Sequence, residues 1–224
     1  MLRRTFLLVL VLILIPCVSY SEIKTTQGLT ADEWFEKSLT LMKGDSGHYT
    51  DPNQALDYLT KAISLESGIA KRYNNRGLAY NQLGKYQQAI EDFNQAINLD
   101  PKDSGAYNNR GIVYTNCGIV YTKSGKFQEA IEDFNQAINL DPKNADVYHN
   151  RGLAYTRLGK FQQAVEDFNQ AINLDPKDAA AYNNRGVCYH NLSQRENACR
   201  DWRRACELGN CSGINWAINK GFCQ

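Results

Sequence analysis

The sequence has almost no net charge and no run of basic residues. Its 224 residues include 25 Lys and Arg against 24 Asp and Glu, which gives a formal net charge of +1 at pH 7. Nucleic acids and anionic lipids attract proteins through clustered positive charge. The composition therefore predicts neither nucleic-acid binding nor attraction to a membrane surface.

Recognisable catalytic and metal-binding motifs are missing as well. The three histidines, His48, His149 and His190, lie far apart, and no Ser-His-Asp, paired-carboxylate or phosphate-loop arrangement accompanies them. None of the seven cysteines belongs to a Cys-x-x-Cys pair, the spacing used by zinc sites and thiol oxidoreductases. We therefore expect no enzyme, no cofactor, no metal and no small-molecule substrate, and keep a thiol-redox enzyme only as an alternative.

The one long hydrophobic run lies at the N-terminus. Two arginines precede the apolar residues Phe6 to Ile15, and small residues lead to a plausible cut before Glu22. This order is typical of a secretory signal. A retained membrane anchor is the alternative, although the run is shorter than the ~20 residues that span a bilayer. A lipoprotein attached through Cys17 is disfavoured by the neighbouring Pro16.

We therefore expect a signal peptide over residues 1–21 and a linker over 22–29. The protein should be exported, periplasmic or secreted, and should contact a membrane only through an uncleaved signal. Loss of the signal removes Arg3 and Arg4, so the net charge changes from +1 to −1.

The rest of the chain is built from a repeat. The stretch Tyr73 to Pro101 recurs in close copies, and the steps from Tyr73 to Tyr107 and from Tyr148 to Tyr182 are both 34 residues. A fixed period of this length indicates a helical solenoid. Each unit contains two apolar stripes at helical spacing, the first ended by glycine and the second by Asp-Pro. One helix pair cannot cover its own stripe, so neighbouring units must stack.

The spacing of the repeated residues resembles the tetratricopeptide repeat (TPR). Two units match the aromatic, Gly, Tyr, Ala, Phe, Ala and Pro positions of that motif in full: Tyr73, Gly77, Tyr80, Ala89, Phe93, Ala96 and Pro101, and Tyr148, Gly152, Tyr155, Ala164, Phe168, Ala171 and Pro176. The resemblance implies an all-α fold, a right-handed α-solenoid of antiparallel helix pairs. It also implies a protein or peptide partner, and the chain is similar to exported bacterial members of the family.

Five repeats and a cap are expected. A degenerate repeat over residues 30–69 begins with a capping box of Thr30 and Glu33, and restarts at Asp51-Pro52 after an enlarged loop. Repeats two to five occupy residues 70–103, 104–144, 145–178 and 179–210. Residues 211–224 should form a C-terminal capping helix over the last repeat.

Repeat three holds a tandem duplication, GIVYTNC at Gly111 to Cys117 followed by GIVYTKS at Gly118 to Ser124. Seven residues are about two helical turns, so the insertion should lengthen the first helix by ~10 Å without turning its apolar stripe away. Alignment on Ala130 favours the frame with Tyr114, Asn116 and Gly118, which leaves Tyr107, Asn109 and Gly111 as an overhang. A bulged or looped-out segment is the alternative.

Six cysteines remain after signal cleavage, an even number that permits disulfides in an exported chain. Cys188 replaces an alanine of other repeats, so we expect a buried small hydrophobe, and Cys117 should be unpaired. Cys199 and Cys206 are ~10 Å apart along one helix and cannot bond each other. Of the two remaining pairings we favour Cys199–Cys223 with Cys206–Cys211, because the cap must lie over this face; the larger loop would contribute ~3 kcal/mol.

Arginine and aspartate recur together at motif positions 7 and 23, which lie three residues after the first tyrosine of the unit and directly before its phenylalanine or tryptophan. We expect half-buried ion pairs between the two helices of a repeat, Arg76–Asp92, Arg151–Asp167 and Arg185–Asp201. A row of arginines that binds anions is the alternative. In repeat three the favoured frame places Cys117 opposite Asp133, so the pair with Arg110 should be broken or displaced.

In TPR superhelices the first helix of each repeat lines the concave surface. The inward positions here carry amides and one histidine: Asn74, Asn75, Asn108, Asn109, Asn116, His149, Asn150, Asn183 and Asn184. A primary amide offers the donor and acceptor that match one peptide unit, and the row is similar to the asparagine ladder of the O-linked N-acetylglucosamine transferases. The basic residues of the chaperone-tail clamp are missing. We expect these residues to bind peptide, with weak amide contacts supplemented by neighbouring side chains.

The leading hypothesis is thus a non-enzymatic adaptor that docks an extended segment of a partner protein in a concave, Asn-lined groove. The alternative is an assembly scaffold of a cell-envelope complex that uses the convex face or the lengthened helix.

Overall fold

The protein is a stack of antiparallel helix pairs. The computed structural model describes residues 28–43, 48–121 and 124–223, and its regular elements there are eleven helices. They are α2 (Ala31–Leu39), α3 (Pro52–Leu65), α4 (Ala70–Gln82), α5 (Tyr86–Leu99), α6 (Ser104–Tyr121), α7 (Ser124–Leu140), α8 (Ala145–Arg157), α9 (Phe161–Leu174), α10 (Ala179–Asn191), α11 (Arg195–Glu207) and α12 (Ser212–Asn219). Each helix packs against the next, which confirms the α-solenoid expected from the sequence.

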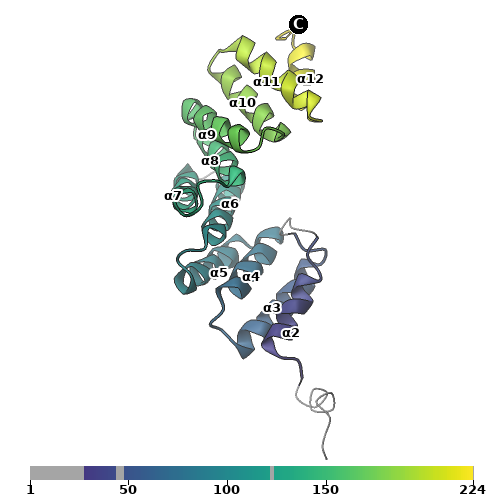
Figure 1. The fold of residues 1–224 in the computed structure, drawn as a ribbon, viewed down its shortest axis with the longest axis vertical. Coiled ribbons are helices and arrows are strands. Elements are labelled where there is room, and N and C mark those ends of the chain that lie inside the picture. The colour runs from purple at the N-terminus through teal and green to yellow at the C-terminus, as the bar shows by residue number, and fades with distance from the viewer. Residues whose placement is uncertain (1–27, 44–47, 122–123, 224) are drawn as a thin grey trace, which may run out of the picture.

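The stack is elongated and curved. Figure 1 shows α2 and α3 at one end and α12 at the other. The first helices of successive repeats contact one another, namely α4, α6, α8 and α10. The second helices, such as α5 and α7, mainly contact the first helices directly before and after them in the chain. Closer approach of the first helices curves the stack and places them on its inner side. No helix in the described ranges is both long and apolar enough to cross a bilayer. The expected signal peptide, and all of the expected linker except residues 28 and 29, lie outside those ranges.

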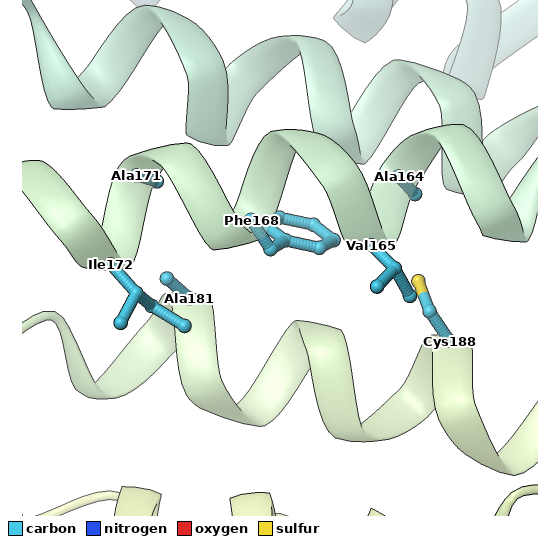
Figure 2. Packing of buried hydrophobic residues seen from close by; sticks show 7 residues of the cluster. All are labelled: Ala164, Val165, Phe168, Ala171, Ile172, Ala181 and Cys188. Atoms are coloured by element: carbon cyan, nitrogen blue, oxygen red, sulfur yellow. The ribbon is translucent and has the colours of Figure 1, made fainter. Parts of the chain in front are cut away.

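Close helix crossings explain the repeated glycines. A Cβ added to Gly152 would lie 2.9 Å from Cε1 of Phe168, a side chain that is fully buried. Figure 2 shows Phe168 between the alanines of α9, with Val165 next to Cys188 of α10. Cys188 is buried as the small hydrophobe that its alanine position predicts.

The degenerate first repeat has the expected helix starts. Thr30 Oγ1 accepts from the Glu33 amide at 3.2 Å while the Glu33 carboxylate accepts from the Thr30 amide at 2.9 Å, which completes the capping box. Asp51 caps α3, with Pro52 in its first turn. Residues 44–47 of the enlarged loop lie outside the described part. After it, residue Tyr49 forms an antiparallel bridge with Met42.

Repeat three differs from our prediction. The frame with Gly111 is the one that aligns with the other repeats, because Gly111 crosses Phe134 as Gly152 crosses Phe168. Arg110 bonds both carboxylate oxygens of Asp133, so the expectation of a broken pair is wrong. Tyr107 and its neighbours therefore form no overhang.

The duplicated residues instead extend the far end of the hairpin. Helix α6 has 18 residues against 13 in α4, and α7 has 17 against 14 in α5. Gly118 crosses Phe127 there as an additional glycine and phenylalanine contact. The inserted residues are thus divided between the two helices of the hairpin. If α6 alone were longer, the apolar stripe on its additional turns would have no helix to cover it.

The C-terminal cap lies on the last repeat. Cys199 is joined to Cys223 and Cys206 to Cys211, the pairing that the sequence favours, with Cα atoms 5.8 and 4.0 Å apart. Trp202 replaces the phenylalanine of other repeats and lies between Gly186 of α10 and Gly213 of α12. Its larger ring therefore reaches the cap as well as its own helix pair.

Candidate functional site

A concave groove of about 750 Å³ runs along the inner side of repeats two to four. Four of the nine predicted peptide-binding residues line it, namely Asn108, Asn109, His149 and Asn150. The other lining residues are His48, Leu78, Asn81, Gln82, Ile112, Ala145, Asp146, Asp175 and Asp178. The groove lining thus combines apolar side chains with amides and carboxylates.

The predicted amides are bonded to one another between repeats. Asn109 Nδ2 donates to Asn74 Oδ1 at 3.0 Å, and Asn150 Nδ2 donates to Asn108 Oδ1 at 3.1 Å. The amide directly before the repeated arginine of one repeat therefore bonds the side chain two residues before the arginine of the preceding repeat. Asn108 uses only its oxygen and Asn109 only its nitrogen in these bonds, so each amide keeps its other group for a ligand.

The same pattern continues at the C-terminal end with other partners. Asn184 Nδ2 lies 3.2 Å from Nε2 of His149, which takes the place of an asparagine. Asn183 Oδ1 accepts from Ser212 Oγ of the cap at 3.3 Å. Asn116 lies in the duplicated segment of α6 and donates to Asn81 Oδ1 at 3.2 Å. These three asparagines hold neighbouring helices together and do not line the groove.

His149 is held in one tautomer. Its Nδ1 lies 2.8 Å from Asp178 Oδ2. An ionised carboxylate can only accept a hydrogen bond, so Nδ1–H of the neutral imidazole donates to Asp178 and Nε2 accepts from Asn184. Burial acts to raise the pKa of Asp178, but the bonds from His149 and from the Ala181 and Ala180 amides outweigh it and lower that pKa. Asp178 is therefore an ionised group at the edge of the groove.

Asn75 is not open to the groove, contrary to our prediction. The residue is 4% exposed, and the hydroxyl of Tyr49 lies 3.0 Å from Asn75 Oδ1 and covers it. The same tyrosine is held through its backbone: its amide donates to Gln82 Oε1 at 2.8 Å, and Gln82 Nε2 donates to its carbonyl oxygen at 2.7 Å. One side-chain amide thus satisfies both backbone groups of an extended residue.

Three of the four arginine–aspartate pairs connect three helices each. Arg151 bonds both oxygens of Asp167 at 2.6 and 2.8 Å and also reaches Asn135 on the second helix of the preceding repeat. The pairs of Arg110 and Arg185 repeat this geometry with Asn94 and Asn169. Arg76 bonds Asp92, while the first repeat offers no asparagine at that position.

Each arginine also lies against tyrosine rings of its own helix, for example Arg151 over Tyr148 at 5.7 Å and over Tyr155 at 6.0 Å. The arginine side chains are only 14 to 19% exposed. These arginines are therefore structural, and the alternative of an anion-binding row gains no support.

Sequence analysis missed the residues that give the groove its ends. Gln82 lies near the end of its helix, whereas the amides that we singled out lie mostly near the helix starts. Tyr49 comes from a loop with no repeat register. Asp146, Asp175 and Asp178 lie at helix termini, where acidic residues are common for local reasons. Only the structure brings them to one surface.

Comparison with protein families and solved structures agrees with this architecture. Family models described as "TPR repeat" match residues 118–159 and 154–193, and models described as "Tetratricopeptide repeat" match residues 70–103 and 93–132. Together these matches extend over more than half of the chain. The chain is a tetratricopeptide repeat protein.

Several solved TPR structures are similar in fold. A MamA protein, residues 41 to the end, from Desulfovibrio magneticus RS-1 is 22% identical, with a TM-score of 0.68, and the match covers 81% of this chain and 96% of that one. YrrB, described as a TPR protein with an unusual peptide-binding site, is 19% identical, with a TM-score of 0.66 and coverage of 89% and 97%. A thermophilic TPR protein of Thermus thermophilus, TTC0263, is 16% identical, with a TM-score of 0.64 and coverage of 86% and 97%. At these identities the likeness concerns the fold alone.

Proposed function

We propose that this TPR protein is an adaptor that holds an extended segment of a partner protein in its concave groove. TPR proteins in general are protein-interaction modules without catalytic activity, and the finer assignment rests on one observation. Gln82 and Asn75 already hold a piece of extended chain, Tyr49, against the inner side of repeat two. The groove begins beside that segment, since His48 and Gln82 line it.

The repeat carries this binding geometry forward. The residue one period after Asn75 is Asn109, which lines the groove. Asn116, one period after Gln82, instead bonds Asn81 and does not line it. Asn109 and its neighbour Asn108 face the groove with unused hydrogen-bonding groups. A peptide that continues past Tyr49 would therefore meet the same kind of partner, while Leu78 and Ile112 offer apolar contact.

The test uses a library of nonapeptides bound to the full-length protein. Ile112→Arg places a charged side chain in the groove and should abolish binding of the selected peptides. Ile119→Arg is the matched control, because Ile119 is the duplicate of Ile112 on the same helix, is 45% exposed, and lies outside the groove lining. Far-UV circular dichroism verifies that both variants fold.

Equal binding by wild type and Ile112→Arg would exclude the groove. Loss of a partner through Ile119→Arg alone would instead support the scaffold alternative, in which the lengthened α6 and α7 hairpin carries the contact. A thiol-redox function gains no support, since four cysteines are paired and burial raises the pKa of the Cys188 thiol.

We further propose that the protein is exported. The signal-like sequence of residues 1–21 and the two disulfides both fit an oxidising compartment. Cell fractionation with N-terminal sequencing should find the chain outside the cytoplasm and cut before Glu22. A cytoplasmic chain with free thiols at all six remaining cysteines would contradict this.

A further inference from the structure

The groove carries charge of one sign at its C-terminal end. Asp146, Asp175 and Asp178 line it, and no Lys or Arg is among its described lining residues. Asp146 is exposed in the first turn of α8 without a cationic partner, and Asp175 accepts only the backbone amide of Lys177. Asp178 is already bonded by His149 and by the Ala180 and Ala181 amides. Asp146 and Asp175 are therefore the two carboxylates of the groove with little local compensation.

Two kinds of occupant could compensate these charges, a metal ion or cationic side chains of a peptide. A metal ion requires at least three ligands around one point, and no group of His, Cys, Asp or Glu side chains in the described residues meets that condition. The carboxylates thus do not converge on one ion, which favours separate cationic side chains on one extended chain.

The opposite end of the groove shows what kind of chain fits. Tyr49 lies there in extended form, with its backbone bonded by Gln82. Residues of an extended strand rise about 3.3 Å each and alternate in direction. A segment that continues from this end would pass the apolar lining residues Leu78 and Ile112 of repeats two and three before it reaches Asp146 and Asp175.

We propose that the groove selects an extended partner segment that carries Lys or Arg residues, which pair with Asp146 and Asp175. This rests on the proposed peptide-binding function and names the chemistry of its partner. The segment is a cationic one with apolar residues at alternate positions, and it is bound weakly enough for salt to compete.

The experiment compares three matched nonapeptides that contain Lys, Gln or Glu at the same alternate positions between leucines. Fluorescence anisotropy with the full-length protein should give the tightest binding for the Lys peptide, and added salt should weaken it. Asp146→Asn should weaken the Lys peptide about two- to fivefold, as expected for one exposed ion pair, and leave the Gln peptide unchanged. Glu166→Gln, which alters an exposed carboxylate on α9 outside the groove, is the control and should change neither.

The outcomes separate the two proposals. If the Gln or Glu peptide binds as tightly as the Lys peptide, and Ile112→Arg still abolishes binding, the cationic preference is wrong and the peptide groove stands. If Glu166→Gln weakens the Lys peptide as much as Asp146→Asn, attraction is general and the preference is also wrong. If no peptide binds, both proposals fail.

Discussion

The Arg110–Asp133 pair distinguishes between the two possible alignments of repeat three with the other repeats. Arg110 Nε and Nη2 bond the two carboxylate oxygens of Asp133 at 2.8 and 2.6 Å, and the side chains are 19% and 7% exposed. Replacement of Arg110 with methionine keeps most of the stem and removes the charge. The variant leaves Asp133 buried without its partner, which costs about 3 to 5 kcal/mol in the free energy of unfolding.

The double variant isolates the pair. Asp133→Leu should also destabilise the protein, because it leaves Arg110 partly buried and unpaired. In Arg110→Met with Asp133→Leu, two apolar side chains meet, so the loss should be smaller than the sum of the single losses by at least about 1 kcal/mol. Contacts of Arg110 with Asn94 and Tyr107 are lost in both the single and the double variant, and they cancel in this coupling energy.

Urea titration followed by far-UV circular dichroism measures these free energies. The exposed pair Asp57–Lys61, with side chains 54% and 46% exposed, provides a control cycle whose coupling should be about 0.5 kcal/mol or less. A coupling of that small size for Arg110 and Asp133 would mean that Arg110 does not oppose Asp133, and that the frame with Gly118 is the right one after all.

The pH dependence of Arg110→Met gives a second check on the same pair. Burial already raises the pKa of Asp133, against the opposing bonds of Arg110. Without the arginine that pKa should rise further above its unfolded value. A raised carboxyl pKa in the folded state means that folding takes up protons, so the destabilisation is complete at neutral pH and shrinks as the pH falls through the folded pKa.

Three further predictions follow from single contacts. Gly111→Ala would place a Cβ 2.7 Å from Phe134 Cε1 and should cost about 1 to 3 kcal/mol in urea titration, whereas Gly68→Ala, with no atom within 4 Å of the new Cβ, should be neutral or slightly stabilising. In native protein a thiol reagent should modify the partly exposed Cys117 well before the buried Cys188, whose pKa burial raises, and mass spectrometry that found equal rates would contradict the fold of repeat five. Asp178→Asn should lower the free energy of unfolding at pH values above the unfolded carboxyl pKa of about 3.9, because the pKa of Asp178 is lowered in the folded state. The difference in this free energy between wild type and variant should vanish as the pH falls through the folded pKa. A constant difference across acid pH would show that ionised Asp178 contributes nothing to stability.

Much of the fold could be predicted because the same packing constraint recurs in each unit. Gly77 and Gly152 must be small where Phe93 and Phe168 cross them, so their spacing alone located the helix pairs. The arginine and aspartate positions were also informative. A buried carboxylate requires a partner of opposite charge. An arginine that recurs at a fixed sequence separation from each aspartate is therefore recognisable as that partner.

The frame of repeat three could not be chosen from the sequence. Two copies of the same seven residues fit the motif equally well, and alignment on Ala130 assumed that only the first helix had grown. In the structure both helices grow, because the apolar stripe of α6 must be covered by α7. The choice depends on packing between two helices, which a one-dimensional alignment does not contain.

The groove was predicted in part for a related reason. Asn108, Asn109, His149 and Asn150 were placed correctly because the motif fixes which positions point inward. The covering of Asn75 by Tyr49 could not be foreseen, since Tyr49 lies in the loop that departs from the repeat. The repeat pattern does not fix where the side chain of a residue outside it will lie, so only the three-dimensional structure shows which surface Tyr49 covers.

The inter-repeat bonds change what the amide row can contribute to binding. An unbonded ladder would offer every donor and acceptor, whereas Asn108 and Asn109 each give one group to a neighbouring repeat. A net gain of about 1 kcal/mol per hydrogen bond cannot offset the ~4 to 15 kcal/mol lost on association with so few groups left. Affinity must then come from the apolar lining residues Leu78 and Ile112 and from the carboxylates beyond them. The amides would fix the path of a bound chain, and its side chains would decide which chain is bound.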